Sequence, residues 1–418
     1  MGKTVLSIQG EDFLVNGKKT YSEIIGSKEQ SHGLLMNARF IQGIFDEKED
    51  ISRFNRFGVK KYDPDKNTDN LIASLDEWYS YGLRAFTVGL QGGGPCFTIS
   101  NDTINNNPFS DDGLSIDSKY LDRLGRIIRA ADEKGMVVIV SYFYHMQISR
   151  IKDATAVVNS VKTASKYLKD QKCTNVIIEI ANEHNAFRSH PIAMEDEGMA
   201  VLINIAREAS GGMPVGCSLT GGRYNEQVTR ASDVILIHGN NCSRQKFYNL
   251  IKKVREISPG KPVVCNEDSQ AIGNMEVSFN LHASWGYYNN MTKQEPPVKW
   301  GVLDGEDRFF AHRMAQGIGI KLDEIPREEQ FYFHGFEPGM EYEGKRWLRV
   351  SSLYPETINY VNFYRNDELI YTCYDEPFSV FWINNWRQDP VLVEDMRGEW
   401  TAEIVLSSGE IISRKNRL

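Results

Sequence analysis

The sequence predicts an α/β protein: a (β/α)8 TIM barrel followed by a small C-terminal all-β sandwich domain. Three observations lead to this prediction. Short apolar runs alternate with amphipathic segments through roughly the first 300 residues, as strand–helix units do. Several of these runs are almost continuous Val, Ile and Leu, which is typical of parallel strands covered on both faces. Beyond Pro326 no long helical pattern remains, and short alternating strands are separated by turn residues.

Eight strand–helix units fit a closed barrel, and an open doubly wound sheet is the structural alternative. No G-x-G-x-x-G motif opens a helix after a strand, so the dinucleotide-binding version of the open sheet has no support. The predicted strands are Leu34–Phe40, Arg84–Leu90, Met136–Tyr142, Val176–Ala181, Pro214–Leu219, Val234–His238, Pro262–Asn266 and His282–Tyr287. The clearest predicted helices are Asp69–Tyr81, Ser118–Lys134, Ala154–Lys169 and Arg244–Ile257.

The chain divides into two predicted domains. Residues 1–325 are expected to form the barrel, preceded by a hairpin in residues 5–20, where Gly-Glu-Asp and Asn-Gly provide the turn signals. Residues 326–418 are expected to form the accessory β-sandwich. Its tryptophans are interpreted as core residues, with sugar binding as the alternative: Trp347, Trp382 and Trp386.

Composition excludes some partners. The net charge of −8 argues against nucleic acid or an anionic membrane surface, because both need a basic face. No apolar run reaches the ~18 residues of a membrane span. The start M-G-K-T-V-L has no apolar signal region, which indicates a cytoplasmic protein or one whose signal was removed, and the compartment and oligomeric state stay open. The six cysteines form no C-x-x-C pair, and we expect no disulfide framework, no metal and no cofactor.

Two predicted strands end in the same dipeptide, Asn182-Glu183 and Asn266-Glu267. In a (β/α)8 barrel the C-terminal strand ends meet at one mouth, where active sites lie. Two carboxylates facing each other there suit the hydrolysis of a glycosidic bond. One carboxyl group donates a proton to the leaving oxygen, and the other attacks the sugar carbon or activates water. Glu183 and Glu267 are therefore the predicted catalytic residues, acting on an oligosaccharide or glycoside.

Other polar and aromatic residues close the remaining strands. Alternation of side chains along a strand places Glu179 inside the barrel, below Glu183. A buried carboxylate needs a partner, and Arg39 is the candidate. The residues expected to bind substrate are Asn37, Arg39, Tyr142, His145, Asn182, His184, His238, Asn240 and Trp285.

The motif N-V-I-I-E-I-A-N-E, followed later by K-P-V-V-C-N-E, resembles the clan A glycoside hydrolases, which are retaining barrel enzymes. The segment G-L-L-M-N-A-R-F-I-Q-G-I-F-D resembles cellulase-like bacterial proteins. The resemblance implies that Glu183 is the acid/base and Glu267 the nucleophile, with Asn182 at the sugar 2-hydroxyl. It also implies that His238 lies beside the nucleophile and that Trp285 floors the subsite next to the scissile bond.

Three positions depart from the clan's pattern. His184 stands where many members have Pro, and Asn240 where many have Tyr. Thr87 aligns with an Arg of the second strand, so Arg39 is expected to supply that charge instead. We further expect Glu183 to lie in the less polar setting, with a raised pKa, and the two carboxyl groups to lie about 5–5.5 Å apart.

Two alternative functions remain open. One is a non-catalytic carbohydrate-binding protein built on a decayed hydrolase barrel. The other is a metal-dependent lyase or isomerase, which needs three ligands on neighbouring strands. The candidate ligands Glu183-His184 and Glu267-Asp268 are expected on opposite sides of the mouth. Long loops at Gly92–Ser115 and Asn289–Arg308, including the Gly92-Gly93-Gly94 run, favour a walled pocket and exo action.

Overall fold

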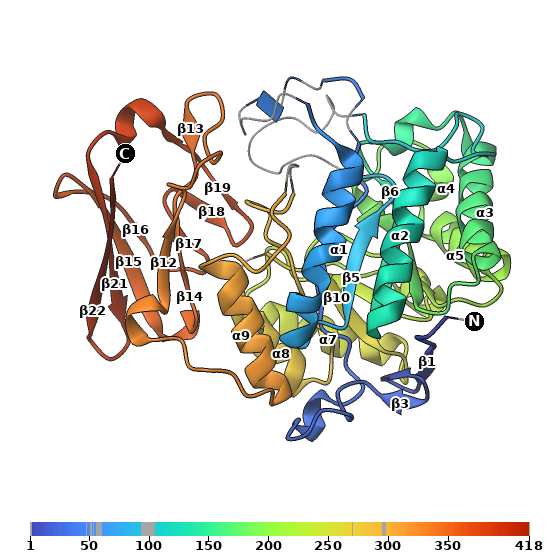
Figure 1. Ribbon diagram of the computed structural model, residues 1–418, viewed down its shortest axis with the longest axis horizontal. Coiled ribbons are helices and arrows are strands. Elements are labelled where there is room, and N and C mark those ends of the chain that lie inside the picture. Colours follow the sequence, from blue (N-terminus) through green and yellow to red (C-terminus); the bar gives the residue numbers. More distant parts are fainter. Residues whose placement is uncertain are drawn as a thin grey trace.

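The computed structural model describes residues 2–46, 48–50, 52, 54–55, 61–92, 105–269, 271–294 and 298–417. Gly93, Gly94 and Cys96 therefore lie outside the described residues, as does part of each long loop. A barrel ringed by helices makes up one side of the molecule, and the C-terminal strands pack against it on the other (Figure 1).

The barrel strands run parallel. Six of them form one sheet in the order β11-β4-β5-β6-β7-β8, and β9 pairs with β10. Single bridges at Val264–Ser284 and Asp268–Tyr287 join β10 to β11, and Asp233 N donates to Val215 O across the β8–β9 gap at 2.8 Å. The predicted strands are all found at their predicted places, as β4 (Asn37–Arg39), β5 (Ala85–Gly89), β6 (Val137–Tyr144), β7 (Val176–Asn182), β8 (Val215–Gly216), β9 (Ile235–His238), β10 (Val263–Glu267) and β11 (Gly286–Tyr287).

Local signals place the helices between these strands. The predicted bounds of α2 and α7 are confirmed, and Gly135 ends α2 in the left-handed region at φ 77°. Helix α1 begins at Pro64 rather than at Asp69, because the Asp63 carboxylate caps it by accepting from the backbone N–H groups of Asp65 and Lys66. The helices are α1 (Pro64–Ser80), α2 (Ser118–Lys134), α3 (Ala154–Asp170), α4 (Pro191–Met194), α5 (Asp196–Ser210), α6 (Glu226–Ala231), α7 (Arg244–Ile257), α8 (Gly273–Asn280) and α9 (Glu306–Ile318).

Alternation along the strands separates two apolar layers. One set of side chains, including Ile139, Ile177 and Val264, fills the barrel interior, while the alternate set packs against the helices. Phe13 belongs to the interior layer. It comes from the N-terminal sheet of β1 (Leu6–Gln9), β2 (Asp12–Val15) and β3 (Lys18–Lys19). Apolar side chains of this sheet therefore complete the interior layer, and the C-terminal strand ends are left for a polar site.

The C-terminal strands have a core of their own, which includes Phe333, Val361 and Trp400. A four-stranded sheet has the order β16-β15-β21-β22, and a three-stranded sheet has the order β12-β14-β17. The strands are β12 (Phe331–His334), β13 (Lys345–Arg346), β14 (Arg349–Ser352), β15 (Ile358–Arg365), β16 (Glu368–Cys373), β17 (Phe378–Ser379), β18 (Trp382–Asn384), β19 (Arg387–Gln388), β20 (Val391–Leu392), β21 (Glu399–Leu406) and β22 (Ile411–Arg417).

A buried ion pair fastens these strands to the barrel. Arg349 Nη2 on β14 lies 2.5 Å from Glu306 Oε2 on α9, and both side chains are almost fully buried. A second guanidinium, Arg313 of α9, donates to Leu353 O and to the Glu356 carboxylate. Replacing either Arg349 or Glu306 alone would leave its partner as an unpaired buried charge, which costs about 3–5 kcal/mol.

The described residues also show the character of the helices and the state of the cysteines. None of the helices described has the length and apolar character needed to cross a bilayer. The five cysteines within the described ranges are free thiols.

Candidate active site

A pocket of about 430 Å³ opens at the C-terminal ends of the barrel strands. This volume lies within the usual range for small-molecule sites, about 300–1,000 Å³. Residues from the barrel and from the β18–β19 hairpin share the lining: Arg39, Ile41, Tyr144, His145, Asn182, Glu183, Thr220, Gly221, Arg223, Asn240, Asn241, Glu267, Tyr288, Asn290, Gln294 and Trp386.

Glu183 reaches the pocket through a backbone irregularity. Strand β7 ends at Asn182, and Glu183 adopts the left-handed conformation at φ 56° and ψ 58°. Non-glycine residues rarely adopt it, and such strain gathers at functional sites. The turn brings Asn182 and Glu183 into the same pocket, although neighbouring residues of a regular strand point to opposite faces.

Glu267 reaches the pocket by a different irregularity. The pairing of β10 with β9 shifts register between Cys265 and Glu267, as at a β-bulge. Bulges re-aim side chains, and they are common beside active sites. Asn266 consequently points into the barrel, where its Nδ2 donates to Glu179 Oε1 at 2.9 Å, while Glu267 lines the pocket.

Arg39 ties these groups together from β4. Its Nε lies 2.8 Å from Glu267 Oε2, and its Nη2 donates to Asn182 Oδ1 at 2.7 Å. Its Nη1 lies 4.0 Å from Glu179 Oε2, so the predicted pairing of Arg39 with Glu179 is present but is the longest of the three. The guanidinium is almost fully buried, and the fork of donors holds one carboxylate and one amide in fixed positions.

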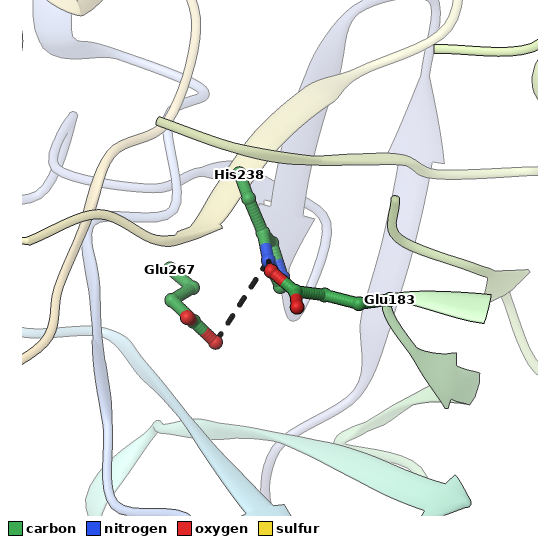
Figure 2. A group of neighbouring side chains, drawn as sticks. All are labelled: Glu183, His238 and Glu267. Atoms are coloured by element: carbon green, nitrogen blue, oxygen red, sulfur yellow. Dashed lines mark hydrogen bonds and ion pairs between the residues drawn. The ribbon is translucent and has the colours of Figure 1, made fainter. Parts of the chain in front are cut away.

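His238, at the end of β9, lies between the two glutamates (Figure 2). Its Nδ1 is 2.9 Å from Glu183 Oε1 and 3.8 Å from Glu267 Oε2, and the ring is fully buried. Burial alone would lower the pKa of His238, but the charge of Glu267 and the bond to Glu183 outweigh burial and raise it. Burial alone would raise the pKa of Glu183, but the bond to His238 and the charges of His238 and Arg39 hold it below its usual value.

The expectation of a raised pKa at Glu183 is therefore wrong. The Glu183 side chain is also the more exposed of the two, at 19% against 9% for Glu267. The sequence places an acid at the strand end but does not show that a histidine nitrogen meets it. The two pKa directions favour a protonated imidazole beside an ionised Glu183 carboxylate.

Two more predicted residues face the same pocket. Asn240 Nδ2 donates to Glu267 Oε1 at 2.5 Å, so both oxygens of Glu267 accept N–H groups. His145 lines the pocket near Glu183, and burial lowers its pKa, which favours the neutral imidazole. The structure thus brings together Glu183, Glu267, Asn182, Arg39, His145 and Asn240, with His238 directly behind them.

The predicted sugar-stacking role of Trp285 is contradicted. Its side chain is fully buried and packs on the helix side of the sheet, with its ring centroid 5.8 Å from that of Phe310. Its Nε1 donates to Asp268 Oδ2 at 2.9 Å, and Asn274 donates to the same oxygen. Burial raises the pKa of Asp268 to about 7. Trp285 and Asp268 thus form a buried contact behind the strand that carries Glu267.

Three other predicted residues also point away from the pocket. Tyr142 is buried on the helix side of β6, 3.0 Å from Ser165 Oγ of α3. Asn37 lies inside the barrel, where its Nδ2 donates to Cys265 O at 3.1 Å. His184 follows the left-handed turn and faces α5, with Nε2 3.5 Å from an Asp196 oxygen. Burial lowers the pKa of His184, which favours the neutral ring. The side chain is not among those that line the pocket beside Glu183.

Several residues that line the pocket are not among the predicted site residues. Tyr144 is the last residue of β6 and Tyr288 directly follows β11, so the strand-end rule points to both. Arg223 and Gln294 lie on loops without a motif. The prediction of a core role is wrong for Trp386, which lines the pocket, and is confirmed for Trp347, which is buried.

Three ligand-type atoms of Glu183, His238 and Glu267 lie within 4.8 Å of one another, a spacing that could hold a metal ion. The expectation that the available ligands lie on opposite sides of the mouth is therefore wrong, because His238 joins them. The surroundings disfavour a cation, however. Arg39 already places a positive charge 2.8 Å from Glu267, and Asn240 donates to the other oxygen of that carboxylate.

Comparison with known proteins supports the class that this fold and site indicate. Residues 47–196 match the family model of the cellulases, glycosyl hydrolase family 5. That range includes Glu183 but not Glu267. The predicted resemblance to cellulase-like glycoside hydrolases is confirmed over this part of the chain. No match was found among curated protein sequences.

Solved structures were also compared with this chain. The chain aligns with a putative glycoside hydrolase from Bacteroides vulgatus at a TM-score of 0.52 and 11% identity, covering 99% of this chain and 75% of that one. An endo-1,4-β-mannanase from Rhizomucor miehei aligns at 0.49 and 12% identity, covering 76% of this chain and 100% of the mannanase. The first likeness, at this identity, supports the fold alone.

Proposed function

We propose that this protein is a retaining glycoside hydrolase in which Glu267 is the nucleophile and Glu183 the acid/base. The observation that carries the proposal is the pair of carboxylates in one pocket, with an oxygen of each within 4.8 Å of the other. Retaining enzymes hold their carboxyl groups about 5–5.5 Å apart, whereas inverting enzymes leave about 6.5–9.5 Å for a water molecule. The family match in residues 47–196 supports the same class.

Glu267 is set up to attack a sugar carbon. Arg39 and Asn240 donate to its two oxygens and hold the carboxylate in place at the pocket. In the first step a Glu267 oxygen bonds to the anomeric carbon while the bond from that carbon to the leaving oxygen breaks. In the second step water displaces Glu267 from the glycosyl-enzyme and returns it to its ionised form.

Glu183 exchanges the proton in both steps. It protonates the leaving oxygen first and then takes a proton from the attacking water. The pKa directions of the pair favour the proton on His238. A substrate that fills the pocket excludes water, and a drier setting favours the neutral pair over the charged one. Substrate binding would therefore move the proton from His238 to Glu183, where it is needed.

Two further assignments belong to this proposal. Asn182, held by Arg39 through its Oδ1, presents its amide N–H to the sugar 2-hydroxyl. Residues 326–418 form an accessory β-sandwich domain beside a barrel domain of residues 1–325.

The test is a screen of aryl glycosides and natural oligosaccharides with the wild type, Glu183→Ala and Glu267→Ala. Wild-type protein should release a sugar whose anomeric configuration is retained, and proton NMR measures that configuration. Glu267→Ala should lose nearly all turnover. Glu183→Ala should lose about 10²–10⁴-fold, the usual size of a general acid/base contribution. Glu276→Ala, an exposed acid on α8, is the matched control and should keep wild-type rates.

Chelation separates this proposal from metal-dependent chemistry. Treatment with EDTA should leave the rate unchanged, and a rate that depends on added divalent metal would contradict the proposed mechanism. A wild-type protein that binds sugars without cleaving any of them would support the non-catalytic carbohydrate-binding alternative.

A further inference from the structure

The tip of the β18–β19 hairpin lies at the mouth of the barrel. The hairpin belongs to the C-terminal strands, and Gln388 Nε2 fastens it to Leu348 O at 3.0 Å. At its tip, Asn385 Nδ2 donates to Cys242 O of the barrel at 2.7 Å. Asn290 Nδ2 of the barrel donates to Trp386 O at 3.5 Å. Contacts on both sides of the tip thus hold Trp386, which lines the same pocket as Glu183 and Glu267.

The two barrel contacts show which part of the pocket the tip covers. Cys242 follows β9, and Asn290 follows β11. Strand β10 lies between β9 and β11 in the barrel ring and ends at Glu267. The hairpin therefore lies over the strand of the proposed nucleophile rather than over β7, which ends beside Glu183.

We infer that Trp386 binds the glycone, the sugar whose anomeric carbon Glu267 attacks, through the apolar face of a pyranose ring. This inference rests on the proposed function and deepens it. The nucleophile must lie directly beside the glycone ring, so a side chain above β10 contacts that ring rather than the leaving group. Among the described residues that line the pocket, Tyr144 and Tyr288 come from the barrel, whereas Trp386 comes from the C-terminal strands. The glycone subsite is therefore completed by two parts of the chain.

The chemistry of Trp386 and of the residues near it fits a neutral sugar ring. An indole offers a large apolar face that the C–H face of a pyranose can cover. Polar groups lie around it for the hydroxyls, including Asn240, Asn241 and Gln294. Trp285, which the sequence suggested for this stacking role, is buried elsewhere, so Trp386 takes its place.

The experiment compares Trp386→Ala and Trp386→Phe with the wild type on aryl glycosides that share one sugar and differ in leaving group. Trp386→Ala should lose about 10- to 100-fold in kcat/KM, by the size of a lost apolar contact. The loss should be equal for good and poor leaving groups, because the glycone is the same. Trp386→Phe should recover most of it. Ile383→Ala, exposed on the same hairpin, should behave as wild type. Thermal unfolding checks that each variant is folded.

A second measurement keeps this inference separate from the proposed function. Calorimetric titration with the free monosaccharides of the screen measures binding without turnover. If wild-type protein binds a sugar but cleaves none, loss of that binding in Trp386→Ala supports the inference while the proposed function fails. If wild-type protein cleaves and Trp386→Ala matches Ile383→Ala, the inference is overturned and the function stands. A loss that varies with the leaving group overturns the glycone assignment, and a protein that neither binds nor cleaves any sugar overturns both.

Discussion

Replacing His238 by glutamine tests whether Glu183 and His238 titrate as one unit. Glutamine keeps a polar side chain of similar length but cannot carry a charge. In the wild type, loss of the pair's single proton should set the alkaline limb of the pH profile of kcat/KM, which reports groups of the free enzyme. In His238→Gln, Glu183 must hold that proton alone.

The expected shift follows from the contact that is lost. The His238 Nδ1 to Glu183 Oε1 distance is 2.9 Å, and the ring is fully buried. A hydrogen bond to a charged group contributes about 1.5–3 kcal/mol. Since one pKa unit corresponds to about 1.4 kcal/mol, the alkaline limb should move to lower pH by about one to two units.

The same pair predicts how stability depends on pH. The lowered pKa of Glu183 gives a contribution that is present above its usual value of 4.5 and is lost as pH falls through the folded value. The raised pKa of His238 gives a contribution that is present below 6.5 and is lost as pH rises through the folded value. His238→Gln should therefore be most destabilised, relative to wild type, between pH 4.5 and 6.5, and chemical unfolding at pH 5.5 and 9 measures the difference.

His145→Gln is the matched control for both measurements. His145 lines the pocket near Glu183, and burial lowers its pKa, which favours the neutral ring. Its replacement should leave the alkaline limb in place. If His238→Gln also leaves the limb within about 0.3 unit of wild type, the shared-proton reasoning is refuted.

Other changes test the framework around the two glutamates. Arg39→Met should lose about 3–5 kcal/mol of stability in urea unfolding, because it leaves the buried Glu267 carboxylate without its counterion. Arg223→Met, exposed on the same pocket, should lose far less. Asp268→Asn should become more stable relative to wild type as pH rises from 4 to 7, because burial raises the Asp268 pKa to about 7; an unchanged difference would contradict this. Gly239→Ala should lower kcat while the protein stays folded, since its Cβ would lie 2.2 Å from an Asp268 oxygen; a wild-type rate would show that the strand end can shift freely.

The barrel was predictable because its signals are local. Runs such as Val176–Ile180 and Val263–Cys265 are apolar, β-branched and bounded by turns, and they become strands where the pattern predicts. The two catalytic candidates were predictable for a related reason. A charged residue directly after such a run must leave the apolar layer, and in a parallel barrel all such residues leave at one end.

The parts that could not be predicted depend on direction or on distant contacts. Trp285 precedes a strand of only two residues, so alternation gave no reliable face, and the indole packs against Phe310 instead. Trp386 is brought to the pocket by a hairpin whose barrel contacts are far away in the sequence. The direction of the pKa shift at Glu183 depends on one nitrogen of His238, which no pattern in the chain reveals.

The repeated Asn-Glu dipeptide shows most clearly where sequence reasoning stops. Asn182 accepts from Arg39 at the pocket, whereas Asn266 donates to Glu179 inside the barrel. The difference arises from the backbone, because a left-handed turn follows Asn182 and a register shift precedes Glu267. Both irregularities turn a glutamate toward the mouth, and each leaves its asparagine for a different task. Arg39 contacts Asn182 and Glu179 on one strand and Glu267 on the other, so one buried guanidinium helps to fix how the two strand ends lie relative to each other.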